Sequence, residues 1–176
     1  MLLLEYRGYG RSGGTVSEEG LKIDAQTALD YLLARADVQC KDIYVFGRSL
    51  GGAVAIDLAA HNSEHVTGLI IENTFTSIAA LVGELMPIFG YFAFLLTHRW
   101  PSLDTITRVQ VPTLVLSGSR DEMIPTNMSQ DLFDRCPAPK KELKKFPDGR
   151  HMETWICGGY FPTFAEFVYK HKTLVK

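Results

Sequence analysis

Short apolar runs that resemble β-strands alternate along this chain with segments that have helical spacing. The first such segment, residues 21–33, repeats its apolar residues with the period of an α-helix. Strands that are apolar throughout need cover on both faces, so the alternation predicts an α/β fold, with a mostly parallel sheet flanked by helices. We expect strands at 2–6, 43–46, 68–72, 113–118 and 142–146, and helices at 21–33, 50–60, 77–96, 126–135 and 161–171.

Length and composition limit the classes of partner and cofactor. The 176 residues predict a single domain over 1–176. A net charge of -2 provides no basic surface, which argues against nucleic acid as a partner. The three cysteines (Cys40, Cys136 and Cys157) are far apart in sequence and lack the spacing of a zinc site or a disulfide framework. The sequence therefore predicts no metal and no cofactor.

Membrane-targeting segments are not evident in the sequence. The longest uncharged run, Leu85–Thr97, contains a proline and a glycine and is shorter than the roughly 20 residues that span a bilayer. Charges at Glu5 and Arg7 interrupt the apolar start of the chain, so no signal peptide is expected. The cellular location stays open.

The stretch Gly47-Arg48-Ser49-Leu50-Gly51 lies between a predicted strand and a predicted helix. A G-x-S-x-G pattern in this setting is typical of a nucleophile elbow, in which the serine occupies a strained, exposed turn. We expect Gly47 and Gly51 to keep side chains out of the crowded backbone around Ser49. The N–H of Leu50, at the start of the helix, is a candidate oxyanion donor. A serine between glycines is also compatible with an ordinary turn.

Two further polar residues follow later strands. Asp121 comes just after the strand at 113–118, and His151 follows the strand at 142–146. The order Ser49, Asp121, His151 is that of an α/β-hydrolase triad. In such a triad the histidine is the general base and the aspartate orients its ring. Glu122 and Asp148 are rivals for the role of the acid, and we rank both below Asp121.

Four stretches together resemble a known family. They are YRGYGRSGGTVSEEGLKIDAQTALDYL, GRSLGGAVAI, ENTFTSI and LSGSRDEMIPTNMSQDLF, and they resemble the α/β-hydrolase domain-containing protein 13 group of serine hydrolases. The resemblance covers essentially the whole chain. It implies an α/β-hydrolase fold, catalytic residues at Ser49, Asp121 and His151, and a small-molecule acyl ester or thioester as substrate. Relatives in this group include membrane-anchored forms.

The resemblance also reveals a difference from the family. Members of the fold have further strands before the YRGYG strand, and a His-Gly loop that supplies a second oxyanion donor. This chain contains no His-Gly pair. We therefore expect an N-terminally truncated domain whose oxyanion hole keeps only the Leu50 N–H, and the loss of one donor typically costs about 10²- to 10³-fold in turnover. Residues 2–6 would then lack their usual sheet neighbour.

Three functional hypotheses remain open at this point. The first is a serine hydrolase that cleaves a carboxylic ester or thioester through an acyl-enzyme. The second is a catalytically impaired truncated product, or an incomplete gene model, that is at most a binding protein. The third is a serine peptidase, which would use the same triad. Residues 73–112 are a candidate cap over the site, and 85–96 within it would either line an acyl pocket or pack into the core.

Overall fold

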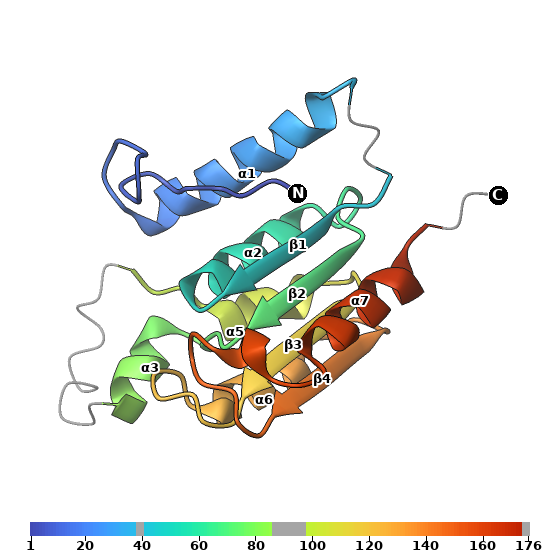
Figure 1. Ribbon diagram of the computed structural model, residues 1–176. Coiled ribbons are helices and arrows are strands. Elements are labelled where there is room, and N and C mark those ends of the chain that lie inside the picture. Colours follow the sequence, from blue (N-terminus) through green and yellow to red (C-terminus); the bar gives the residue numbers. More distant parts are fainter. Residues whose placement is uncertain (38–40, 86–97, 174–176) are drawn as a thin grey trace. The chain divides into compact units, whose positions relative to one another are not determined.

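The computed structural model describes residues 1–37, 41–85 and 98–173 (Figure 1). The chain divides into two compact units, Met1–Lys41 and Asp42–Lys176. Each unit is described by itself.

In residues 1–37, the first unit has an N-terminal loop followed by one helix, α1 (Glu18–Ala34). The Ser17 hydroxyl caps α1 by accepting the Gly20 N–H at 3.0 Å. The Arg7 guanidinium ties the loop to α1, because Nη2 donates to Asp24 Oδ1 at 2.7 Å and Nε donates to Oδ2 at 3.1 Å. The expected helix is confirmed. The expected strand at 2–6 is wrong, since the described part of this unit has no second strand with which an extended segment could pair.

The second unit is built on a four-stranded parallel sheet in the order β1-β2-β3-β4. The central strands are buried at every position, whereas the outer strands are partly exposed. This difference explains why the run at 141–146 tolerates charged residues, because it forms an outer strand. The predicted α/β fold and its last four strands are confirmed. The strands are β1 (Tyr44–Arg48), β2 (Gly68–Glu72), β3 (Thr113–Gly118) and β4 (Lys141–Phe146).

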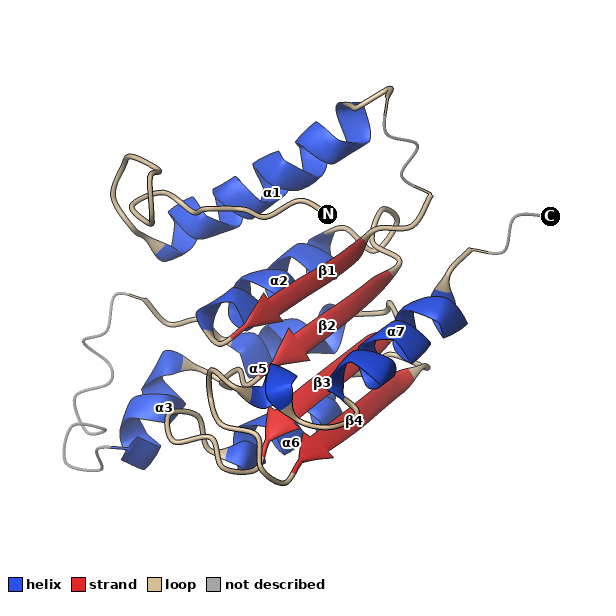
Figure 2. Ribbon diagram, in the orientation of Figure 1, coloured by secondary structure: helices blue, strands red, loops and turns tan. Residues whose placement is uncertain are grey.

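Helices cover both faces of this sheet (Figure 2). The helix α7 packs on one face, where Phe167 and Tyr160 join a buried cluster with Ile70, Leu114 and Phe146. Helices α2 and α6 lie on the other face, α2 against β1 and β2 and α6 against β3 and β4. The helical elements among the described residues of this unit are α2 (Leu50–His61), α3 (Ile78–Leu85), α5 (Ser102–Thr105), η2 (Ile106–Arg108), α6 (Thr126–Arg135), η3 (Thr154–Ile156) and α7 (Tyr160–His171).

The helix expected over 77–96 is described only as far as the end of α3. Residues 86–97, which hold nearly all of the apolar run in the candidate cap, lie outside the described residues. The role of 73–112 as a cap therefore stays a prediction.

Parallel pairing brings the carboxyl ends of all four strands to one edge of the sheet. Arg48 pairs with Glu72, and Gly118 pairs with Phe146, so the strands end level in pairs. Loops beyond the carboxyl ends of parallel strands are where α/β folds hold their ligands. The three candidate catalytic residues, Ser49, Asp121 and His151, lie in the loops after β1, β3 and β4.

Candidate active site

Ser49 is held in a strained turn between β1 and α2. Its backbone has φ 54° and ψ -123°, a conformation that is rare for residues other than glycine. Three hydrogen bonds hold the turn. The Ser49 N–H donates to the Glu72 carbonyl at 2.9 Å, and the Ser49 carbonyl accepts the Gly52 N–H at 3.0 Å and the Thr74 hydroxyl at 2.5 Å. These bonds maintain a backbone geometry that the residue would not adopt alone.

Glycine is sterically required at Gly47. A Cβ at this position would lie 2.0 Å from the carbonyl oxygen of Gly51. The same steric role expected for Gly51 is wrong, because a Cβ on Gly51 would meet nothing within 4 Å. The second crowded glycine is instead Gly52, whose Cβ would lie 2.6 Å from the Thr74 side chain. The role of Gly52 was not predicted from sequence, because its neighbour lies on the loop after β2.

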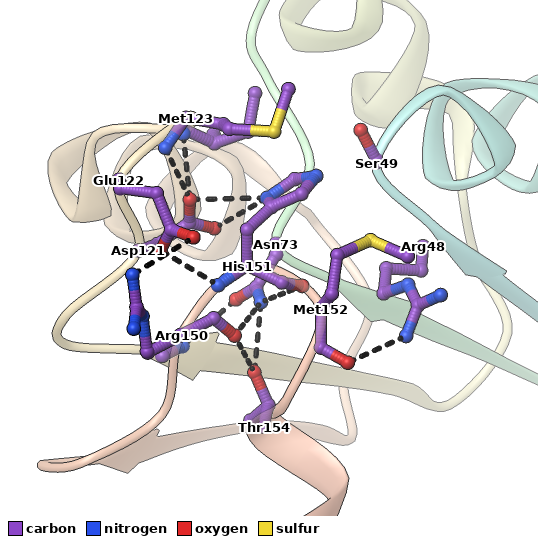
Figure 3. Close-up of polar contacts among 12 residues, drawn as sticks. Arg48, Ser49, Asn73, Asp121, Glu122, Met123, Arg150, His151, Met152 and Thr154 are labelled. Atoms are coloured by element: carbon purple, nitrogen blue, oxygen red, sulfur yellow. Dashed lines mark hydrogen bonds and ion pairs between the residues drawn. The ribbon is translucent and has the colours of Figure 1, made fainter.

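Asp121 and His151 form a buried pair beyond β3 and β4 (Figure 3). Nδ1 of His151 lies 3.0 Å from Oδ1 and 2.9 Å from Oδ2 of Asp121, and the two side chains are 3% and 1% exposed. Oδ1 also accepts the N–H groups of Met123 and Ile124, each at 2.8 Å, which fixes the carboxylate. Because a carboxylate can only accept, Nδ1 carries the proton and Nε2 of the neutral ring is left as an acceptor.

The two rival carboxylates have other contacts. Glu122 accepts the backbone N–H of His151 at 3.3 Å and lies 3.6 Å from Arg150, with its side chain 49% exposed. Backbone hydrogen bonds, from its own N–H and from that of His151, lower the pKa of Glu122. Asp148 pairs with Arg120 at 3.2 Å on the surface. Of the three acids, only Asp121 bonds the imidazole ring.

Ser49 and His151 come from separate loops that meet at this edge of the sheet. In Figure 3 the His151 ring lies between the Asp121 carboxylate and the Ser49 hydroxyl, and no hydrogen bond is drawn between the ring and the hydroxyl. Such bonds are often long in free enzymes and tighten when substrate binds. Leu50, the candidate oxyanion donor, is the first residue of α2, where backbone N–H groups have no partner within the helix.

The loop after β2 contains a functional candidate that was not predicted from sequence. Asn73 is buried, has φ 46°, and donates from Nδ2 to the His151 carbonyl at 3.1 Å. Its Oδ1 accepts the Gly118 N–H at the end of β3, at 2.8 Å. The available signal was its position, since Asn73 directly follows a strand, as Ser49 does.

A second buried acid lies beside the Ser49 turn. Glu72 is 1% exposed and accepts the hydroxyl hydrogen of Tyr160 at 2.7 Å. Burial raises the pKa of Glu72, although the bond from Tyr160 acts in the opposite direction. Burial and the neighbouring carboxyl likewise raise the pKa of the Tyr160 phenol. Glu72 is thus a carboxyl that the fold favours in its neutral form.

Within the described ranges, no group of three or more His, Cys, Asp or Glu side chains is arranged to hold a metal ion. None of the helices in that part of the chain is long and apolar enough to cross a membrane.

Known proteins share this sequence pattern and this fold. A family model described as serine aminopeptidase, S33, matches residues 1–106 and 103–154. The chain is 40% identical, over 187 residues, to the alpha/beta hydrolase domain-containing protein WAV2 of Arabidopsis thaliana, covering 97% of this chain and 61% of that protein. It is 42% identical, over 170 residues, to protein bem46 of Schizosaccharomyces pombe, covering 96% and 57%. The chain therefore spans less than two thirds of the length of these relatives.

The fold has a close counterpart among solved structures. An esterase of Pyrococcus furiosus, Pf2001, superposes with a TM-score of 0.75 at 20% sequence identity, covering 96% of this chain and 69% of that one. At this identity the likeness concerns the fold, and it agrees with the parallel sheet and flanking helices described above. With the family model matching most of its length, the chain belongs to the serine aminopeptidase (S33) family of α/β hydrolases.

Proposed function

We propose that this chain carries the machinery of a serine hydrolase that cleaves a carboxylic ester or thioester. The observation that carries the proposal is the buried Asp121–His151 pair, 2.9 Å apart, at the same edge of the sheet as the strained Ser49 turn. A histidine held by a buried carboxylate can accept a serine proton near neutral pH.

The reaction proceeds in two halves. Nε2 of His151 takes the Ser49 proton as Oγ attacks the substrate carbonyl carbon, and the Leu50 N–H donates to the resulting oxyanion. When the carbonyl re-forms, the bond to the leaving alcohol or thiol breaks, and that group receives the proton from Nε2. An acyl-enzyme on Ser49 remains. Water then gives its proton to Nε2, attacks the acyl carbon and releases the acid, and Ser49 recovers its proton.

The comparisons guide the choice of substrate. The name of the Pyrococcus furiosus esterase favours an ester as the first class to test. The description of the matched family favours a second candidate, removal of an N-terminal amino acid, which would use the same three residues. A panel of 4-nitrophenyl esters, acyl thioesters and aminoacyl 4-nitroanilides distinguishes these activities by their relative kcat/KM.

A fluorophosphonate probe tests the proposal directly, because it reacts only with an activated serine. We expect the 176-residue chain to be labelled on Ser49, and Ser49→Ala to abolish the labelling. Ser12→Ala is the matched control, because Ser12 lies in a second G-R-S-x-G stretch and donates its hydroxyl hydrogen to the Glu5 carbonyl at 2.9 Å. A chain that folds but takes no label would contradict the proposal and favour a binding role.

A further inference from the structure

The tripeptide Glu72-Asn73-Thr74 is bonded to the Ser49 turn, to the His151 loop and to the end of β3, the strand that leads to Asp121. Its Glu72 carbonyl and Thr74 hydroxyl bond Ser49, and its Asn73 side chain bonds the backbone of His151 and of Gly118, the last residue of β3. All of these contacts lie within the second unit. The Ser49 turn, the end of β3 and the His151 loop are therefore connected through one short segment at the end of β2.

The side chain of Asn73 is hydrogen-bonded both to the His151 loop and to the end of β3. Nδ2 has acceptors at the Arg150 carbonyl (3.3 Å), the His151 carbonyl (3.1 Å) and Thr154 Oγ1 (2.8 Å). Oδ1 accepts the Gly118 N–H at 2.8 Å. The one amide thus links the His151 loop to the strand from which Asp121 follows, as Figure 3 shows for the His151 side.

The backbone of Asn73 indicates that this arrangement is maintained against a local cost. Its φ of 46° lies in the left-handed region, which asparagine tolerates better than most residues. Its N–H donates to the Leu116 carbonyl at 3.1 Å, so the strained residue is bonded at both backbone and side chain. Strain of this kind persists only where the surroundings over-determine the conformation.

Thr74 acts on the other half of the site. Its hydroxyl donates to the Ser49 carbonyl at 2.5 Å, while its side chain fills the space beside Gly52. Together with the bond from the Ser49 N–H to the Glu72 carbonyl, this contact fixes the Ser49 backbone on both sides. The direction of the Ser49 Cα–Cβ bond is set by these contacts.

We infer that Asn73 and Thr74 are positioning residues that hold the His151 ring and the Ser49 hydroxyl in mutual register, an inference that rests on the proposed function. Neither side chain needs to touch substrate. Asn73 acts through the His151 backbone and Thr74 through the Ser49 backbone. Displacements of an ångström in such groups are enough to lower rates by about 100-fold.

Two substitutions test Asn73 in the full chain. Asn73→Gly keeps the left-handed backbone accessible and removes the amide, while Asn73→Asp keeps the shape and removes the donor. We expect each to lower the rate of fluorophosphonate labelling at Ser49 by about 10- to 100-fold. The matched control is Asn62→Ala. Asn62 is also buried, but it lies just after the far end of α2, away from the site, where its Nδ2 donates to the Leu58 carbonyl at 2.9 Å.

A readout that needs no probe separates this inference from the proposed function. The proton shared by His151 Nδ1 and Asp121 gives a low-field ¹H NMR signal when the pair is formed. We expect the signal to shift or broaden in both Asn73 variants and to persist in Asn62→Ala at an equal loss of thermal stability. If the unchanged chain takes no label, the proposed function fails, but the NMR signal still tests whether Asn73 holds His151.

Thr74 has its own pair of variants, which guards against a failure of the Asn73 variants to fold. Thr74→Val removes the hydroxyl at nearly constant volume, and we expect labelling to slow by about 3- to 10-fold, the size of one lost hydrogen bond. Thr74→Ser should restore most of the rate. Thr105→Val, which removes a hydroxyl bonded to the Pro101 carbonyl at 2.9 Å, is the control. Equal labelling rates in the Thr74 and Thr105 variants, with an unchanged NMR signal in the Asn73 variants, would overturn the inference.

Discussion

The stretch G-R-S-x-G occurs twice in the chain, at 10–14 and at 47–51, and the two copies fold differently. In the first copy the first and last glycines take the left-handed conformation, with φ 52° at Gly10 and 93° at Gly14, and the Ser12 hydroxyl bonds the Glu5 carbonyl. In the second copy the serine itself is left-handed, with φ 54° at Ser49. The same sequence pattern thus places the left-handed backbone on glycines in the first copy and on the serine in the second.

The difference lies in what flanks each copy. The second copy follows β1 directly and leads at once into α2, so its turn is clamped between a sheet and a helix. The first copy has no strand before it among the described residues, and its helix begins four residues later. A short motif of this kind therefore predicts a nucleophile only where a strand precedes it and a helix follows it.

Replacing the first glycine of each copy with alanine should give the largest difference in stability between the two copies. In Gly47→Ala the new Cβ would lie 2.0 Å from a backbone oxygen, so we expect the Ser49 turn to be lost, at more than the usual overpacking cost of about 1–3 kcal/mol. In Gly10→Ala the nearest obstacle is the flexible Glu5 carboxylate at 2.4 Å, and the cost is mainly the left-handed backbone, about 1–2 kcal/mol. Urea unfolding measures both.

The labelling assay gives an independent view of the same pair of variants. We expect Gly47→Ala to lose fluorophosphonate labelling and Gly10→Ala to keep it. If the two variants lost the same stability and the same labelling, the steric account of the second copy would be wrong.

The second expected effect concerns the reactivity that we propose for Ser49 and not for Ser12. Asp121→Asn would place an amide donor at His151 Nδ1 and favour the ring tautomer that cannot take the Ser49 proton. We expect labelling to slow by about 10³- to 10⁴-fold. Asp148→Asn is the matched control, because that carboxylate is 75% exposed and pairs with Arg120 on the surface. An equal effect of the two substitutions would reassign the acid.

Much of this site follows from residues that are close in sequence. The Ser49 turn was predictable because Gly47 and the flanking strand and helix lie within a few positions of it. Asp121 was predictable as the first acid beyond a buried strand. The roles of Gly52 and Asn73 were not, because their partners, Thr74 and the His151 loop, are brought near by strand pairing that the sequence does not spell out.

The central strands and residues 2–6 differ in the same way, in whether distant segments pair with them. The central strands were predicted correctly, and each of these apolar runs pairs with a neighbouring strand on both sides. Residues 2–6 have the same apolar character, yet they form no strand in the described structure, and Leu3 is 80% exposed. A strand is a property of a pair of segments, so an apolar run alone cannot establish one.

The third prediction concerns the buried carboxyl of Glu72, the residue whose backbone carbonyl accepts the Ser49 N–H in the second copy. The raised pKa of Glu72 means that the protonated form stabilises the fold fully below its ordinary pKa of 4.5, and that this contribution is lost as pH rises through the raised pKa. Glu72→Gln has no such loss. As pH rises from 4.5 through the raised pKa, the unfolding free energy of the Glu72→Gln variant should therefore increase relative to that of the unchanged chain. The increase should be about 1.4 kcal/mol for each unit by which the pKa of Glu72 is raised.

Chemical denaturation at a series of pH values between about 2 and 8 measures the effect. Glu122→Gln is the control with the opposite sign, because the lowered pKa of Glu122 stabilises the fold above its ordinary value and the contribution is lost as pH falls. Parallel pH profiles for the two variants would contradict the burial argument for Glu72.

The smallest effect comes from the last glycine of each copy, and here the two copies should differ in sign. Gly51 lies inside α2 with no atom within 4 Å of the position that an alanine methyl would take, so Gly51→Ala should stabilise the chain by about 0.5–1 kcal/mol through the lower entropy of the unfolded state. Gly14 has φ 93°, and Gly14→Ala should destabilise it by about 1 kcal/mol. Urea unfolding curves resolve shifts of this size when the slopes agree. If Gly51→Ala were destabilising, the second copy would require both of its glycines. Its geometry would then depend more on the residues of the motif than on the strand and helix around it.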